Sequence, residues 1–259
     1  MVNTELFLIC LVSFLASGLT LISGFGLGTI LLPVFAIFFP LDIAIGLTAI
    51  VHLLNNIFKL LLLGKHAHIP TLLNFGIPSV IAAACGAWIL LKLTGMHAIY
   101  SYVWNENTYS IYPVNLIIGV LLFIFALMEI IPALKNMQFD RKHFVAGGIL
   151  SGFFGGLSGH QGALRSAFLI KAGLTREQFL ATGITIACLI DFTRITIYSG
   201  HIKTAFQQEY VLLIAAVLSA FAGVFIISRL LHKITIATIQ KIVAVMLIIF
   251  SVMIGAGII

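Results

Sequence analysis

Four charged residues lie within long apolar stretches of this sequence: Lys59, Arg165, Asp191 and Arg194. A charge inside a spanning helix costs about 2.5–3.5 kcal/mol on insertion scales, so each of these residues needs a reason to be there. Three of the four are cations, and buried cations surrounded by hydrogen-bond donors suit a small anion. These residues therefore indicate anion binding inside a membrane. The alternative is that Asp191 and Arg194 form an internal ion pair that only holds helices together.

The charged residues belong to two polar stripes on predicted helices. Asp191 and Arg194 are three residues apart and share one helix face, which Gly183, Ala187 and Tyr198 extend. A second stripe lies about 135 positions earlier in the chain and consists of Thr48, His52, Asn55 and Lys59, with Asn56 beside it. Lipid does not accommodate such stripes, so both must face protein or a cavity. Lys59 lies one turn from a predicted helix end, where a snorkelling side chain explains it nearly as well as a function.

Each stripe is preceded by a glycine-rich break. The first break is Ser23-Gly24-Phe25-Gly26-Leu27-Gly28, and the second is Ser158-Gly159-His160-Gln161-Gly162. Glycine permits positive φ angles and close backbone approach. A short helix follows each break, and the free N–H groups at its start suit an anion. The predicted substrate-binding residues are therefore Gly24, Gly26, Gly28, Asn55, Asn56, Lys59, His160, Gln161, Gly162, Arg165 and Arg194. Close helix packing through small residues is the alternative explanation of the glycines.

Two histidines lie deep in apolar segments, His52 and His160. A histidine can change its charge near neutral pH, so either of them could take part in proton coupling, and Asp191 is a further candidate, with His52 and Asp191 as the coupling pair. Hydrogen bonding within the core is the alternative for both histidines. The sequence contains no cluster with metal-ligand spacing, no phosphate-binding loop and no nucleophile–base set, so no metal, cofactor or enzymatic activity is predicted.

The composition identifies the solvent of this chain as lipid. Of its 259 residues 61% are hydrophobic and 8% are charged, and the mean hydropathy is +1.18. Soluble domains carry about 25% charged residues. The net charge of +6 could suggest nucleic acid. No basic patch interleaved with exposed aromatic residues accompanies it, so nucleic-acid binding is excluded.

Apolar windows predict an all-α integral membrane protein with one transmembrane domain over residues 1–259. The expected helices are 5–22, 28–39, 43–63, 73–93, 113–133, 143–156, 162–173, 177–199, 209–230 and 236–258. Some of them are too short to span, since a span takes about 20 residues. We expect each glycine break to form a hairpin, followed by three spanning helices. The chain then divides into two repeats of opposite orientation, residues 5–133 and 143–258, as in secondary transporters.

The distribution of cations predicts the orientation in the membrane. The expected crossings place eight cations on one side: Lys65, Lys135, Arg141, Lys142, Lys171, Arg176, Arg229 and Lys233. Only Lys92 and Lys203 fall on the other side. Because cytoplasmic loops are rich in Lys and Arg, we predict a multi-pass inner-membrane protein with both termini outside the cytoplasm. The loop 94–112 is then external. Its aromatic residues indicate an interface belt rather than a ligand site.

The two halves resemble the sulfite exporter TauE/SafE family. The first half matches from Gly24 to Pro33 and again over Leu41–Thr48. The second half matches at Gly155–Gly162 and from Gly173 to Gly183, so that the resemblance extends over essentially the whole chain. It implies export of sulfite, sulfoacetate or a related organosulfur anion.

Several residues depart from the pattern of the family. His160 and Gln161 stand where glycine is usual, Phe168 replaces a proline, and Arg165 is an addition. The pair of Asp191 and Arg194 is not part of the general pattern either. These departures leave the identity of the anion open, while the added cations suit an anion.

These observations lead to a secondary transporter that exports a small anion, a sulfur oxyanion or organosulfonate, by alternating access. Two alternatives stay open: a passive anion channel with the same residues, and a membrane-embedded assembly protein whose polar stripe joins helices. The expected partners are the small anion and the lipid bilayer, with proton coupling and a homodimer as further options.

Overall fold

The computed structural model describes residues 2–23, 27–135, 137–230 and 236–259. Gly24, Gly26 and Lys233 lie outside these ranges. The helices are α1 (Val2–Ser23), α2 (Leu27–Ala36), α3 (Leu41–Leu63), α4 (Ile69–Thr71), α5 (Ile77–Thr94), α6 (Pro113–Ile130), α7 (Pro132–Lys135), α8 (Phe144–Ser158), α9 (Gly162–Leu169), α10 (Arg176–Gln208), α11 (Tyr210–Leu230) and α12 (Ile236–Gly255). Short 3₁₀ turns occur at Gly64–His66 and Arg141–His143, a π-helical turn at Leu72–Gly76, and two strands, β1 (Tyr100–Trp104) and β2 (Asn107–Ile111), form a hairpin.

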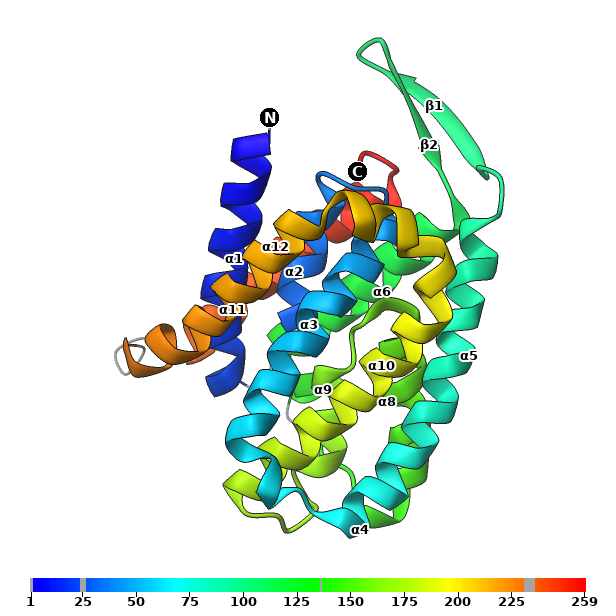
Figure 1. The fold of residues 1–259 in the computed structure, drawn as a ribbon. Helices are drawn as coiled ribbons and strands as arrows, with labels where there is room; N and C mark the ends of the chain where they lie inside the picture. The colour runs from blue at the N-terminus through cyan, green and yellow to red at the C-terminus, as the bar shows by residue number, and fades with distance from the viewer. Residues whose placement is uncertain (1, 24–26, 136, 231–235) are drawn as a thin grey trace.

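The helices form a membrane-protein bundle with a clear polarity. The two termini and the β1–β2 hairpin lie at one end of the molecule, and α4 lies at the other (Figure 1). Within the described residues, four helices are long and apolar enough to cross a membrane: Leu41–Leu61, Ile69–Thr94, Pro113–Ile130 and Arg176–Gln208. Large apolar side chains such as Leu61, Ile81 and Phe192 are exposed on the outside of the bundle. An exposed apolar surface of this extent is expected of a protein surrounded by lipid, and the prediction of an all-α membrane protein is confirmed.

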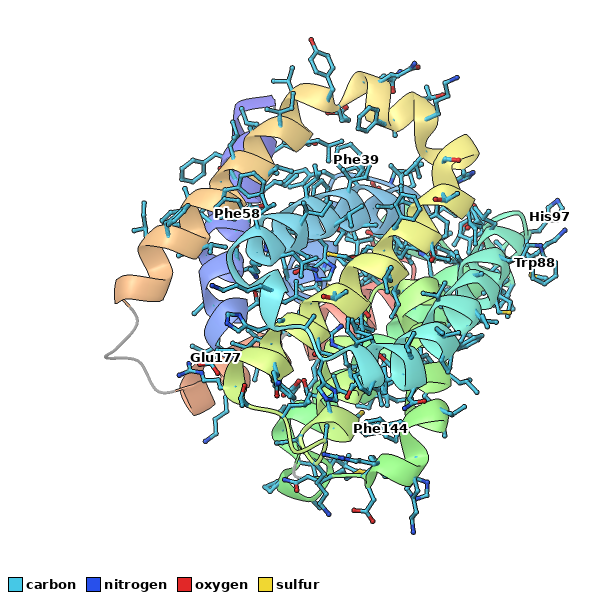
Figure 2. All side chains as sticks on the ribbon, turned by 60° about the horizontal axis from the view of Figure 1, so that its bottom comes forward. Phe39, Phe58, Trp88, His97, Phe144 and Glu177 are labelled. Carbon is cyan, nitrogen blue, oxygen red and sulfur yellow. The ribbon has the colours of Figure 1, made fainter. Side chains whose placement is uncertain are left out.

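Helices from the two halves of the chain pack against each other in pairs. The helix α5 packs along α8, α1 along α11, α3 against α10, and α6 against α12. Phe58 of α3 also stacks on Phe221 of α11, with ring centroids 4.4 Å apart, and it lies beside that helix in Figure 2. The core of the molecule is thus built between the two halves.

The contact between α5 and α8 depends on glycines at a spacing of four residues. Gly148, Gly152 and Gly156 lie against the backbone of α5 and its π-helical turn, and a Cβ atom at any of them would collide with that backbone. Small residues at this spacing bring helix backbones close together in membranes. Close packing therefore accounts for the glycines along α8, although not for those of the breaks themselves.

Helix boundaries follow local sequence signals. The helix α10 begins with a capping box, in which Thr175 accepts from the Gln178 N–H and the Gln178 side chain accepts from the Thr175 N–H. It continues nine residues beyond the predicted end at 199. The predicted helix 113–133 instead ends at Ile130, because the residue before Pro132 disfavours helical backbone. The predicted helix 73–93 begins at Ile69 and includes the π-helical turn.

The loop 94–112 contains a β-hairpin that was not predicted from the sequence. Its strands pair antiparallel, and the turn residues Asn105 and Glu106 have φ angles of 49° and 67°. Positive φ at both turn positions matches the twist of a two-residue hairpin. Tyr102 stacks between Tyr100 and Tyr109, and its hydroxyl donates to the Ala256 carbonyl, which ties the hairpin to the C-terminal residues.

Candidate functional site

Asp191 is the centre of a buried polar cluster between α3 and α10. Its Oδ2 lies 2.5 Å from Nδ1 of His52, and its Oδ1 accepts from Nε of Arg194 at 3.0 Å. Asp191 and Arg194 have no exposed surface, and His52 is 4% exposed. Buried charges are usually paired and hydrogen-bonded, as Asp191 and Arg194 are here. The two polar stripes predicted from the sequence therefore meet. Each carboxylate oxygen of Asp191 has its own partner, one in each stripe.

The hydrogen bonds of His52 define its tautomer. A carboxylate can only accept, so Nδ1 of His52 carries the hydrogen that points to Asp191. The amide nitrogen of Asn56 lies 3.2 Å from Nε2 of His52 and donates to it in this orientation of the amide. This arrangement describes a neutral imidazole. A flipped Asn56 amide would present its oxygen to a protonated Nε2, so the same residues can accommodate either charge state.

The second glycine break lies directly against Arg194. Gly159 ends α8 with a φ of +83°, and a Cβ atom built there would be 2.7 Å from Nη1 of Arg194. Gly28 of the first break is near the same point, because a Cβ atom on it would lie 3.8 Å from the Gly159 carbonyl oxygen. The last residue of the first break therefore lies beside the second break, where the polar stripes meet. Gly24 and Gly26 lie outside the described residues, and Gly162 begins α9.

His160 and Gln161 are almost fully buried in the second break, at 2% and 1% exposure. The His160 ring stacks on Phe125 with centroids 5.7 Å apart, and its Nδ1 lies 3.1 Å from the Ser158 carbonyl oxygen. The side-chain oxygen of Gln161 accepts from Nη1 of Arg165 at 3.1 Å. Arg165 itself is half-buried and lies against Gly183 of α10.

Lys59 is buried rather than extended to the surface. It is 4% exposed, and its Nζ donates to the Thr20 hydroxyl at 3.4 Å. Among the residues that the structure describes, no carboxylate lies within 4 Å of this ammonium group. Snorkelling thus does not describe Lys59. Asn55, on the same helix, accepts from the Ser17 hydroxyl at 2.9 Å.

A third polar stripe, on α1, lies beside these residues and was not predicted from the sequence. Ser13, Ser17 and Thr20 are buried, and they follow one another at spacings of four and three residues. The signal was available, since this spacing places three hydroxyls on one face of an otherwise apolar helix. Tyr198 was seen on the stripe but not assigned to the site, and its hydroxyl donates to the Gly156 carbonyl.

Three buried donors in this region have no hydrogen-bond partner among the described residues: Nδ2 of Asn55, Nε2 of Gln161 and Nη2 of Arg194. Nε2 of His160 has none there either, but it is an acceptor in the neutral ring, because Nδ1 donates to the Ser158 carbonyl. Nη2 of Arg194 is 2.9 Å from Oδ1 of Asp191, so it contributes to the ion pair without the alignment of a hydrogen bond. A buried donor left unpaired costs about 1–3 kcal/mol. An anion with several oxygens is the type of ligand that such donors would bind.

A small cavity adjoins the breaks. It has a volume of about 10 Å³ and is lined by Thr29 of α2, by His160 and Gly162, and by residues of α6 and α12. This is room for about one water molecule. The cavity is too small for a larger anion in the conformation described. Within the described residues, no group of three His, Cys, Asp or Glu side chains could hold a metal ion.

Comparison with known proteins identifies the family of this chain. The family model of the sulfite exporter TauE/SafE matches residues 9–254, which is nearly the whole chain. No curated protein and no solved structure gives a significant match. Because the family model spans both glycine breaks and both polar stripes, the chain belongs to the sulfite exporter TauE/SafE family.

Proposed function

We propose that this protein is a secondary transporter that exports a small anion, a sulfur oxyanion or organosulfonate, by alternating access. Its family consists of membrane transporters of sulfite and related sulfur compounds, not of enzymes. The observation that carries the proposal is the charge of the buried cluster. Three cations, Lys59, Arg165 and Arg194, lie in this region, and among the described residues only Arg194 has a carboxylate, that of Asp191, within 4 Å.

The buried residues divide into two roles in this proposal. Lys59 and Arg165 supply positive charge, and within the described part of the chain neither forms an ion pair with a carboxylate. Asp191 holds Arg194 beside Gly159, so that Arg194 is positioned at the break with part of its guanidinium free. An oxyanion with three or four oxygens can accept from several of these donors together, and charge-assisted hydrogen bonds are about twice as strong as neutral ones.

Two features support inverted repeats as the basis of alternating access. The helices after the breaks, α2 and α9, begin at Leu27 and Gly162, which are 135 residues apart. The next helices, α3 and α10, begin at Leu41 and Arg176 with the same separation. The helix pairs α5–α8 and α1–α11 are related by this offset, with partners exchanged between the halves. Repeats that exchange conformations can expose one central site to each side of the membrane in turn.

The pair of His52 and Asp191 is the proposed site of proton coupling. His52 faces Asp191 and Asn56, and Arg194 is the next charged group along the cluster. Binding of an anion to Arg194 would compete with the ion pair between Arg194 and Asp191, and so would change the hydrogen bonding of the carboxylate that His52 contacts. Proton binding would thereby be coupled to anion binding.

The proposal is tested by exchange across vesicle membranes. Purified protein in vesicles loaded with one sulfur anion should take up a trace of the labelled anion against its gradient, because a carrier exchanges substrate whereas a pore does not. Sulfite, thiosulfate, sulfoacetate and taurine would be compared with acetate and chloride. Uptake that never exceeds equilibrium would indicate the passive channel. Absence of any transport or anion-dependent stabilisation would favour the assembly protein.

A matched pair of lysine substitutions assigns the site. We expect Lys59→Gln to abolish exchange. Lys92→Gln should leave it unchanged, because Lys92 lies over the ring of Trp88, 5.5 Å from its centroid and outside the buried cluster. The label of Trp88 in Figure 2 marks this position at the edge of the bundle. Equal rates in both variants would remove Lys59 from the proposed site.

A further inference from the structure

A second pocket lies at the α4 end of the bundle, and none of its lining residues belongs to the site described above. It has a volume of about 260 Å³ and is formed by α4, the π-helical turn, the 3₁₀ turn before α8 and the first turn of α8. Phe144, labelled in Figure 2, forms part of its wall. Two cations, Arg141 and Lys142, and two neutral polar side chains, His68 and Asn74, line the pocket. Its polar groups therefore suit an anion.

The polar groups of the pocket are held in place by neighbouring backbone. Arg141 donates through Nη2 to the Ala172 carbonyl. This hydrogen bond anchors the guanidinium, whose remaining N–H groups can donate to a ligand in the pocket. Nδ1 of His68 accepts from the Thr71 N–H at 3.4 Å, so a neutral His68 carries its hydrogen on Nε2. Asp140 precedes Arg141 but lies 3.6 Å from the ammonium of Lys171, and it does not line the pocket.

The pocket continues into the lipid-facing surface of two packed helices. Val145 lines the pocket, and Val145 and Ile149 are exposed, four residues apart on α8. Ile77 and Ile81 are exposed at the same spacing on α5, which packs along α8. A charged cavity thus adjoins two apolar stripes. A soluble anion would use only the first of these features.

We infer that this pocket binds the phosphate group of an acidic phospholipid, whose acyl chains lie along α5 and α8. Basic pockets between transmembrane helices are suited to acidic lipid headgroups, and each nearby cation strengthens the attraction. A zwitterionic lipid carries the same phosphate, but its own cation offsets the charge that Arg141 and Lys142 would recognise. The bound lipid would thereby connect Arg141 and Lys142, which lie between the two halves of the chain, to the packed helices α5 and α8.

The inference is tested with the full chain in a neutral detergent. Thermal unfolding is followed while phosphatidylglycerol, phosphatidylcholine with the same acyl chains, or inorganic phosphate is added. We expect phosphatidylglycerol to raise the unfolding temperature at a concentration at which the other two have no effect. Equal stabilisation by both lipids would overturn the recognition of charge. Stabilisation by inorganic phosphate alone would assign the pocket to a soluble anion and overturn the lipid.

Matched variants locate the effect. Lys142→Gln should raise the half-maximal concentration of phosphatidylglycerol about five-fold. Lys65→Gln should leave it unchanged, since Lys65 is an exposed cation that does not line the pocket. Asn74→Asp is a second variant for the case that Lys142→Gln does not fold. It adds a negative charge to the pocket without altering the Arg141 anchor, and it should weaken phosphatidylglycerol binding at least about five-fold. The same shift in Lys65→Gln as in the pocket variants would mean general attraction to a basic surface and would overturn the specific site.

Discussion

Replacement of Lys59 by methionine should make the protein more stable and inactive. A lysine at the centre of a spanning helix costs about 2.5–3.5 kcal/mol. Lys59 is one turn from the end of α3, so its cost is smaller, and its hydrogen bond to Thr20 returns about 1 kcal/mol. Methionine fills a similar volume without a charge. We therefore expect Lys59→Met to raise the free energy of unfolding by about 1–2 kcal/mol.

Stability and transport should change in opposite directions when Lys59 is replaced. If Lys59 is present because it binds substrate, its replacement removes the free-energy cost of burying the ammonium group and also removes transport. Reversible unfolding in mixed micelles, followed by circular dichroism, measures the stability. Counterflow in vesicles measures the activity. Lys92→Met is the control, since it loses a contact with Trp88 worth about 0.5–1 kcal/mol and should keep full transport.

One result would refute the argument. A Lys59→Met protein that is less stable than the parent and still transports would show that the ammonium group holds the helices together. In that case the charge of Lys59 would be structural, and the anion site would rest on Arg165, Arg194 and the glycine breaks.

Three further predictions concern the same cluster. Asp191→Asn should lower the free energy of unfolding by about 3–5 kcal/mol, because it leaves a buried guanidinium without its carboxylate, and adding Arg194→Gln should recover part of this loss in the same unfolding assay. Gly159→Ala should destabilise by more than about 1 kcal/mol, since its φ is +83° and its Cβ would meet Arg194. Gly200→Ala, at a helical position with nothing within 4 Å, should instead stabilise by about 0.5–1 kcal/mol, and similar effects of the two alanines would contradict the special backbone at the break. His52→Gln should keep downhill exchange but lose its acceleration by a pH gradient. Exchange rates of this variant measured with and without the gradient test this, and they should be equal.

Much of this architecture is encoded in local sequence. Apolar length, the Thr175 capping box and Pro132 set helix boundaries through interactions within a few residues. The burial of Asp191 and Arg194 could be predicted because lipid is costly for a charge, whichever helix faces them. The predicted α2 and α9 each begin within one residue of the structure for the same local reasons.

The features that the sequence did not reveal depend on contacts between distant residues. The hydrogen bond between His52 and Asp191 joins residues 139 positions apart, so only the packing of α3 on α10 creates it. The π-helical turn before α5 has no strong signal of its own and accompanies the close approach of Gly148 to Phe75. The hairpin was hidden because its aromatic residues were attributed to a membrane interface, and its turn, Asn105-Glu106, lacks the glycine that marks most such turns.

The two halves differ at the positions that matter most for charge. The residues 135 positions before Asp191 and Arg194 are Asn56 and Lys59, so each half has one cation on its stripe but only the second has a carboxylate. Arg194 is therefore held by its own helix, whereas Lys59 depends on a hydroxyl of α1. A symmetric pair of cations would bind an anion equally in both orientations of the repeats. The proposed substrate should instead interact more strongly with Lys59 and compete with Asp191 for Arg194. Restoring the symmetry with Asn56→Asp should therefore weaken anion binding while it stabilises the empty protein.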